Sequence, residues 1–323
     1  MYKKFILKLG IGLTVVFSLY SIFVLNFKMY YMDPEYPMWK EVKDRCLMKS
    51  NKVEDIIMLG DSRAKAGFKP TVAKNISAIN LSVGGATPIE GYYTLKRYLA
   101  NNPAPKNLII SYTPTHLSAS DGCYFARTVP FDFFENNEYK EVEQLSLKFH
   151  TDYILKQHKS YLDYKFPMIY GQHFSDGIMH MRWLKNSVFY KYSKEERGYH
   201  WFGVKDKADQ LNTEAKETTF IVSKLYDYYF KQLLNITKNK NIKVYFYIMP
   251  FNKSSFDAVN KNYVRDYEKY ITKLSKPYHM KICNKVFSMP NTSFGDPSHL
   301  YHGVDKNTLK ILNCIDNETL EKN

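Results

Sequence analysis

Short continuous apolar runs alternate with a longer amphipathic segment in the first half of the chain. The runs at residues 55–59, 78–82 and 107–112 are bounded by turn residues, which is typical of strands buried in a parallel sheet. Between the last two runs, apolar positions over residues 88–100 recur at helical intervals. Strand, helix and strand in this succession predict an α/β layered fold with a central parallel sheet.

The same pattern returns near the C-terminus. The predicted elements there are a helix over 213–238, a strand over 243–249, a helix over 255–275, a strand over 280–286 and a helix over 306–315. We therefore expect residues 53–120 and 213–323 to form one α/β domain.

Residues 121–212 lack clear periodicity and separate these two halves. From residue 121 to residue 220 the chain holds 21 aromatic residues and five of its nine histidines. We predict that this segment is an inserted subdomain with an aromatic core. If it has a function of its own, we expect it to be a lid or a partner-docking surface over the site.

One N-terminal segment is apolar and long enough to cross a membrane. Residues 5–25 span 21 positions, which at about 1.5 Å per residue cover a hydrocarbon core of roughly 30 Å. Lys3, Lys4 and Lys8 precede or begin the segment, so the positive-inside rule leaves the N-terminus in the cytoplasm and exports the rest. We expect residues 1–30 to be an uncleaved, single-pass anchor.

A cleaved signal peptide is the alternative, but no small-x-small cleavage site follows the apolar segment. Residues 31–52, with Pro34 and Pro37, are expected to form a stalk between the membrane and the α/β domain.

Composition narrows the class of protein further. A hydrophobic content of 45% and an aromatic content of 16% exclude a disordered chain. The net charge is +14, yet its lysines are spread along the chain and form no compact basic run with interleaved aromatics. We therefore expect a lysine-rich surface and no nucleic-acid partner. Attraction to anionic lipid or glycan is the weaker alternative.

The cysteines and histidines predict neither a metal site nor a cofactor. Their spacing fits no CxxC or HxxxH ligand pattern. Outside the cytoplasm the four cysteines could pair in three ways or remain buried thiols. They are Cys46, Cys123, Cys283 and Cys314.

Gly60, Asp61 and Ser62 directly follow the first predicted strand. A serine at the carboxyl end of a parallel strand lies where α/β sheets open their ligand crevice, which suits a nucleophile. The same three letters also mark ordinary turns and helix caps.

Asp296 and His299 lie on one predicted loop near the C-terminus. A carboxylate three residues before a histidine can accept from Nδ1–H and leave Nε2 free as the base for a serine from elsewhere in the fold. Together with Ser62, these residues supply the three groups that acyl transfer by a serine enzyme needs: a nucleophile, a base and a carboxylate that orients the base.

Three motifs resemble the first, second and fifth sequence blocks of the SGNH (GDSL) hydrolase superfamily. They are Gly60-Asp61-Ser62, Gly84-Gly85 after the second strand, and Asp296-x-x-His299. The N-terminal span and residues 59–70 are similar to membrane-anchored SGNH proteins that modify bacterial surface polymers, such as alginate O-acetylation and teichoic acid D-alanyl-transfer proteins. The resemblance covers roughly residues 53–115 and 220–315 and implies a three-layer SGNH-like fold.

The resemblance also implies roles for individual residues. Ser62 would be the nucleophile, His299 the base and Asp296 its orienter, and the backbone N–H groups of Ser62 and Gly84 or Gly85 would line the oxyanion hole. The superfamily's third block supplies a side-chain donor from a Gly-x-Asn-Asp motif. This chain departs from that motif and offers as substitutes Thr113, Thr115 or His116.

The expected function is an extracytoplasmic serine acyltransferase or esterase at the bacterial cytoplasmic membrane. It would move an acyl group, expected to be acetyl, to or from a cell-surface polysaccharide. A single-pass protein cannot carry acyl chemistry across the bilayer, so the resemblance implies a multi-pass acyl-exporting partner. The alternatives are D-alanyl transfer to teichoic acid and a non-catalytic glycan- or partner-binding subunit with a relic triad.

Overall fold

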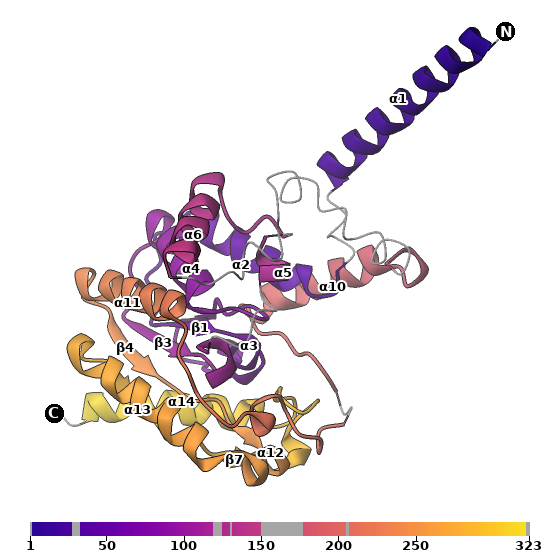
Figure 1. Ribbon diagram of the computed structural model, residues 1–323. Helices are drawn as coiled ribbons and strands as arrows, with labels where there is room; N and C mark the ends of the chain where they lie inside the picture. Colours follow the sequence, from indigo (N-terminus) through magenta and orange to yellow (C-terminus); the bar gives the residue numbers. More distant parts are fainter. Residues whose placement is uncertain are drawn as a thin grey trace.

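A five-stranded parallel sheet lies at the centre of the molecule (Figure 1). The computed structural model describes residues 2–27, 33–118, 125–129, 131–149, 177–204 and 207–320. In spatial order the strands are β2 (Ala78–Asn80), β1 (Ile56–Gly60), β3 (Asn107–Ser111), β4 (Lys243–Phe246) and β6 (Lys281–Ile282). All neighbouring pairs in this sheet are parallel, as the sequence predicts.

The strand order places a topological switch point between β1 and β3. The chain leaves β1 toward one edge of the sheet and, after β2, returns to β3 on the other side of β1. Connections that diverge in this way leave a crevice at the carboxyl ends of the two strands, where open α/β sheets bind their ligands. Ser62 follows β1 at this point.

Helices cover both faces of the sheet and give three layers. Ile57, Leu59 and Leu108 point into one core together with side chains of α2 (Tyr36–Leu47), α4 (Pro88–Asn101), α11 (Lys224–Asn239) and α13 (Lys261–Tyr278). Ile56, Met58 and Ile109 point into the opposite core with α3 (Ser62–Gly67) and α14 (Val304–Leu320). This alternation is what the period-two geometry of a strand dictates when both faces are buried.

Local sequence signals fix the ends of the helices. Thr87 caps α4, and the Glu90 carboxylate accepts from the Thr87 backbone N–H at 2.7 Å, while Pro88 occupies the first turn. The remaining elements are short or peripheral. They are η2 (Pro70–Val72), η3 (Pro114–His116), α5 (Phe125–Thr128), α6 (Asn136–Lys148), α10 (Arg182–Glu195), η5 (Glu214–Lys216), β5 (Phe251–Asn252), α12 (Lys253–Ala258), β7 (Ser288–Met289) and η6 (Asn291–Ser293).

Several predicted boundaries in the second half were wrong. The helix expected from residue 213 begins at Lys224, because residues 214–216 form a separate 3-10 turn. The helix expected over 255–275 is two helices, since Asn260 interrupts the pattern and its side chain caps α13 by accepting from the Asn262 N–H at 2.8 Å. The strand expected over 280–286 is confined to β6.

The stalk predicted for residues 31–52 is wrong for most of its length. Residues 36–47 form α2, which packs against α4 and α10. Met38, Trp39, Val42 and Cys46 are each 3% exposed or less and lie in the core shared with β1 and α4. The helical spacing of these four residues was the missed signal, because two prolines favoured an extended reading.

Replacing the buried Trp39 is expected to show that α2 belongs to the folded core. Trp39→Ala should lower the free energy of unfolding by about 3 to 5 kcal/mol, because it removes a large side chain from a packed interior. Leu47→Ala, at the exposed end of the same helix, should change it by about 0.5 kcal/mol or less. Denaturant titration of the full chain in detergent measures both, and equal small effects would contradict a core role for α2.

Part of the inserted region packs its aromatic side chains into the core of the α/β domain. Phe131, Phe133, Phe134 and Tyr139 lie in the same core as α2, α4 and α11. Arg97 of α4 pairs with Glu138 of α6, which fixes this segment to the domain. Residues 150–176, with His150, His158 and His173, lie outside the described residues.

The cysteines divide between one disulfide and one buried thiol. Cys283 and Cys314 form a disulfide that links the segment after β6 to α14 across a sequence separation of 31 residues. Closing a loop of this length contributes roughly 3 to 4 kcal/mol by restricting the unfolded chain. Burial raises the pKa of the Cys46 thiol to about 12, so this thiol stays protonated. Cys123 lies outside the described residues.

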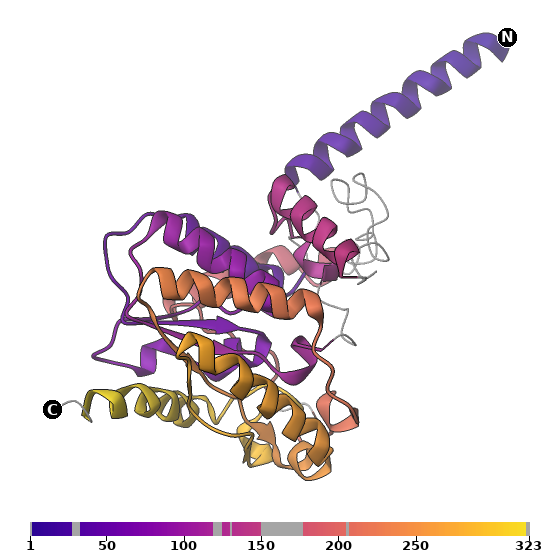
Figure 2. The same cartoon turned by 60° about the vertical axis from the view of Figure 1, so that its left-hand side comes forward.

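The N-terminal helix α1 (Tyr2–Phe27) extends away from the α/β domain (Figure 2). Its first 21 residues, Tyr2–Ile22, are long and apolar enough to cross a membrane, and none of this stretch is buried against the rest of the chain. A helix with exposed apolar side chains on all sides has no stable place in water. The structure thus contains the apolar helix that the sequence predicts, and its length and composition fit an anchor and a signal sequence alike.

Candidate active site

Ser62 is the first residue of α3 and follows β1 after one linking residue, Asp61. The Asp61 side chain caps the helix, since its Oδ1 accepts from the N–H groups of Arg63 at 2.9 Å and Ala64 at 3.3 Å. This cap turns the chain sharply at the end of the strand and leaves Ser62 partly exposed at the helix start.

Asp61 also joins this turn to the neighbouring strand. Its Oδ2 accepts from the Thr113 backbone N–H at 2.8 Å, just beyond β3. The carboxylate is fully buried, and besides these backbone N–H groups of α3 and the segment after β3 it faces His116, whose Nδ1 is 3.6 Å away. The Asp of the Gly-Asp-Ser sequence therefore holds the crevice in shape.

His299 reaches the serine from a loop between η6 and α14. Its Nε2 lies 2.7 Å from the Ser62 Oγ, and its Nδ1 lies 2.7 Å from the Asp296 Oδ2. The structure thus brings together the three residues that the sequence singled out, although Ser62 and His299 are 237 positions apart.

The loop that carries Asp296 and His299 is fixed by its own backbone. The second Asp296 oxygen accepts from the N–H groups of Ser298 and His299, each at 2.8 Å. Burial opposes ionisation of Asp296, but the hydrogen bond and charge of His299 and these two N–H groups outweigh it, so the Asp296 pKa is lowered. The carboxylate is ionised at neutral pH and accepts from Nδ1–H, which leaves Nε2 as the acceptor for the Ser62 hydroxyl.

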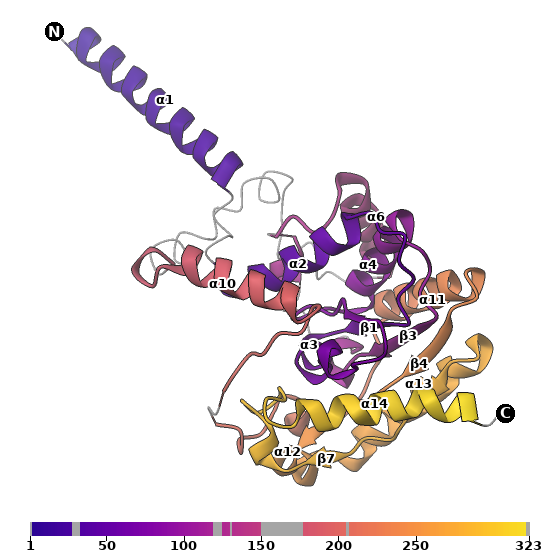
Figure 3. The same cartoon turned by 180° about the vertical axis from the view of Figure 1, so that it is seen from behind.

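A segment of the inserted region covers the imidazole. The Phe202 ring stacks on His299 with centroids 4.3 Å apart and planes 27° apart. The approach is close because Gly203 and Gly295 face each other: a Cβ on Gly295 would lie 1.9 Å from the Gly203 carbonyl oxygen. Figure 3 shows the chain after α10 running past α3 toward the start of α14, which is the path this segment takes.

Two of the predicted oxyanion donors remain available. The parallel register of β1 and β2 continues beyond the strands, because the Val83 N–H donates to the Gly60 carbonyl at 3.2 Å, and this places the Gly84-Gly85 turn beside Ser62. Gly85 has φ +74°, which the third residue of a type II turn requires and which glycine adopts most easily. Among the described residues, the N–H groups of Ser62 and Gly85 have no hydrogen-bond partner.

The predictions of Gly84 and Thr113 as oxyanion donors are wrong, because the donor groups of both residues have other partners. The Gly84 N–H faces the Met38 sulfur at 3.2 Å, because α2 packs against this turn. The Thr113 N–H is taken by Asp61, and its hydroxyl pairs with the Thr115 hydroxyl at 3.3 Å. Thr115 in turn donates to Glu214.

Thr115 and His116, the other two residues predicted as possible oxyanion donors, also have hydrogen-bond partners. The His116 Nδ1–H donates to the Ala86 carbonyl at 2.7 Å, which ties the loop after β3 to the glycine turn. Glu214, which accepts from Thr115 at 2.9 Å, also pairs with the buried Arg63 next to the serine. These residues support the walls of the crevice.

Sequence reasoning missed Glu35, which precedes α2. Its carboxylate pairs with Arg127 at 2.8 Å, and its second oxygen is buried without a described hydrogen-bond partner, against Gly84. Burial raises the Glu35 pKa, although the charges of Arg127 and His299 oppose the shift. A titratable group beside the glycine turn is therefore part of this site's electrostatics, and the predicted stalk carried no signal for it.

Lys65 lies one helical turn after Ser62 but points away from the reaction centre. Its ammonium is fully buried, 3.4 Å from the Asn80 carbonyl and 3.9 Å from the Glu41 carboxylate of α2. Burial lowers its pKa to about 8. Burial and the Lys65 charge also lower the pKa of His200 to about 3, so this imidazole is neutral.

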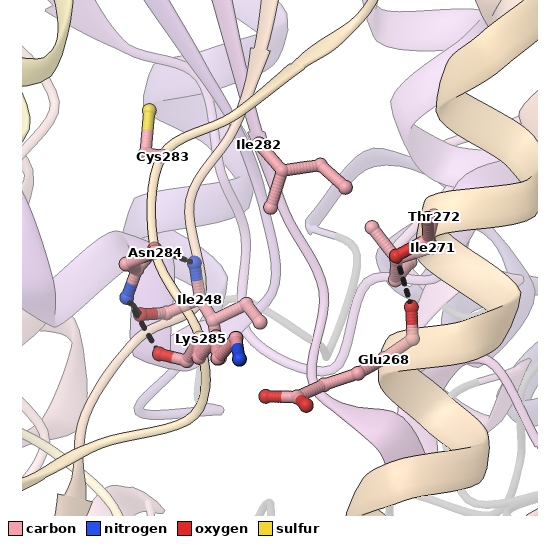
Figure 4. Close-up of a pocket in the computed structure, with 8 residues that line it drawn as sticks. All are labelled: Ile248, Glu268, Ile271, Thr272, Ile282, Cys283, Asn284 and Lys285. Atoms are coloured by element: carbon pink, nitrogen blue, oxygen red, sulfur yellow. Dashed lines mark hydrogen bonds between the residues drawn. The ribbon is translucent and has the colours of Figure 1, made fainter.

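No group of three or more metal-ligating side chains occurs in the part of the chain that the structure describes. The cavity in Figure 4, of about 340 Å³, lies between α13 and the segment after β6 and shares no residue with the three motifs. Its polar groups serve the fold: Asn284 donates to the Ile248 carbonyl at 2.9 Å, and Glu268 accepts from the Val286 N–H.

Comparisons with known proteins add no family assignment. No protein-family model matches the chain, and no curated protein matches it significantly.

Proposed function

We propose that this protein is an extracytoplasmic serine acyltransferase or esterase with an SGNH-like site that acts on a cell-surface glycan. One observation carries the proposal: the Ser62 hydroxyl, the His299 imidazole and the Asp296 carboxylate form a continuous hydrogen-bonded chain at the switch point of a parallel sheet.

The chemistry follows from this arrangement. His299 Nε2 takes the proton of Ser62 as its oxygen attacks the acyl carbonyl carbon of the donor, and the proton then passes to the leaving group. The acyl group is held as an ester on Ser62. A sugar hydroxyl then gives its proton to His299, attacks the ester and releases Ser62, which recovers the proton. Water in place of the sugar makes the same site an esterase.

The backbone N–H groups of Ser62 and Gly85 are suited to stabilise the negative oxygen that forms in each half of the reaction. Such donors act strongly because they are held in place before charge develops. The start of α3 adds a favourable peptide dipole at the same position.

The sequence and structure support a location outside the cytoplasm. Lysines at the start of α1 orient it with the N-terminus inside, and the Cys283–Cys314 disulfide suits an oxidising compartment. An acetyl transfer there requires a multi-pass membrane partner that exports the acyl group. D-alanyl transfer to teichoic acid uses the same chemistry and is the closest alternative.

A non-catalytic glycan- or partner-binding protein is the alternative of a different class. Labelling with a fluorophosphonate separates it from the enzyme, because this probe reacts covalently only with an activated serine. We expect the intact mass of the full chain in detergent to rise by one adduct, and Ser62→Ala to abolish the adduct. No adduct in either protein would favour the binding role.

A further inference from the structure

A second cavity lies between the segment after α10 and the start of α14. It has a volume of about 340 Å³ and is open to solvent. Its walls include four Tyr and Trp rings and three polar side chains, namely Tyr192, Tyr199, Trp201, Tyr301, Lys69, His302 and Asp305.

The segments that build this cavity are those that position the base and the nucleophile. Trp201 directly precedes Phe202, whose ring stacks on His299. Tyr301 and His302 follow His299 on the same loop. Lys69 lies just beyond α3, the helix that begins with Ser62. The cavity is therefore built on the segments that continue from Ser62 and His299, although neither of these residues lines it.

The aromatic walls are rigid. Tyr192 packs its ring against Trp201 with centroids 4.5 Å apart and planes 83° apart, and Trp201 stacks on the buried His200 at 5.7 Å. Trp201 and Tyr301 are partly exposed at the cavity. Rings held in this way offer flat apolar surface at little cost in conformational entropy.

The charged groups at the cavity form no cluster of cations, and with the Glu196 carboxylate counted they carry one more negative than positive charge. The Lys69 ammonium lies 3.5 Å from the Glu196 carboxylate, and Asp305 brings a further negative charge to the cavity. A polyanion would need a cluster of unpaired cations, and an acyl chain would need a continuous apolar lining. Flat rings beside hydrogen-bonding groups of both signs suit a neutral ligand with an apolar face and many hydroxyls.

We propose that this cavity is the acceptor subsite and binds a neutral pyranose unit of the glycan, with the Trp201 ring as its platform. The inference rests on the proposed function and names its substrate class. The hydroxyl to be acylated belongs to the sugar unit next to the bound one. It transfers its proton to His299 and forms the new ester as the Ser62 ester bond breaks.

Calorimetric titration tests the subsite without any need for catalysis. The full chain carrying Ser62→Ala, in detergent, is titrated with cellotetraose, chitotetraose, mannotetraose and, as an anionic comparison, tetragalacturonate. We expect at least one neutral tetrasaccharide to bind more tightly than tetragalacturonate. Adding Trp201→Ala should raise its Kd about tenfold or more, and Trp201→Phe, which keeps a ring, should recover part of the loss.

Trp183→Ala is the matched control, because Trp183 lies near the opposite, N-terminal end of α10 and is 42% exposed. It should change Kd by less than about twofold. The inference is overturned if no neutral tetrasaccharide binds, or if Trp201→Ala and Trp183→Ala behave alike. Fluorophosphonate labelling reports separately on Ser62, so sugar binding without labelling would retain the subsite and reject the enzyme.

Discussion

Ser62→Ala is expected to lower kcat for hydrolysis of p-nitrophenyl acetate by about 10⁴- to 10⁶-fold. The substitution removes the only atom that can form the acyl-enzyme in the proposed mechanism, while the helix cap by Asp61 and the N–H of residue 62 remain. The remaining rate would come from the oxyanion donors and from substrate binding. The measurement is steady-state kinetics of the full chain in detergent.

The adjacent loop offers a control for this experiment. Ser298 uses its backbone N–H to hold Asp296, and Ser298→Ala keeps that contact. We expect the control to stay within about threefold of the unsubstituted chain. If Ser62→Ala retained a tenth or more of kcat, Ser62 would not be the nucleophile and the proposed mechanism would be wrong.

The sheet could be predicted because its signals are local. Residues 55–59 and 107–112 are short apolar runs bounded by turn residues. Such runs are typical of strands that are buried on both faces of a parallel sheet. The juxtaposition of Ser62 with Asp296 and His299 could be anticipated from the chemistry of the two motifs, because a serine nucleophile needs a base and a carboxylate that orients it. The strand order does not explain it, since the loop with His299 follows η6 and β7, and β7 pairs with β5 in a separate two-stranded sheet.

The errors at the glycine turn, Gly84-Gly85, have one physical origin. Met38 lies in a segment that two prolines made resemble a stalk, yet α2 buries four of its side chains in the domain core. That packing places the Met38 sulfur on the Gly84 N–H, which removes Gly84 as an oxyanion donor. It also brings the Glu35 carboxylate against the same glycine. A tertiary contact between α2 and the glycine turn leaves no trace in the local pattern of either segment.

The inserted region shows the same limit. No periodicity indicated that Phe202 would stack on His299, because this contact depends on the close approach of Gly203 and Gly295. The prediction of a lid or docking surface over the site remains a prediction. Within the described residues of the insertion, the segment from Tyr199 to Gly203 contacts His299 directly through the Phe202 ring.

Replacing Asp296 is expected to give the second large loss of activity. Asp296→Asn is expected to lower kcat by about 10⁴-fold, because an amide can place N–H in the position of the Oδ2 acceptor and favour the His299 tautomer with a proton on Nε2. That tautomer cannot accept the Ser62 proton. The other oxygen of the side chain can still accept from Ser298 and His299, so the loop should keep its shape.

The pH dependence separates this mechanism from a purely structural effect. The Asp296 pKa is lowered in the folded protein, so the carboxylate stays ionised as pH falls to well below neutrality, and any stability it adds is lost only in acid. Asp296 itself should therefore add no pH dependence to the defect of Asp296→Asn between about pH 6 and pH 9. Asp257→Asn, at an exposed surface pair with Lys253, should leave kcat unchanged. A variant of Asp296 that recovered its rate at high pH would show that Asp296 does not fix the tautomer, because raising pH cannot return an acceptor to the Nδ1 side of His299.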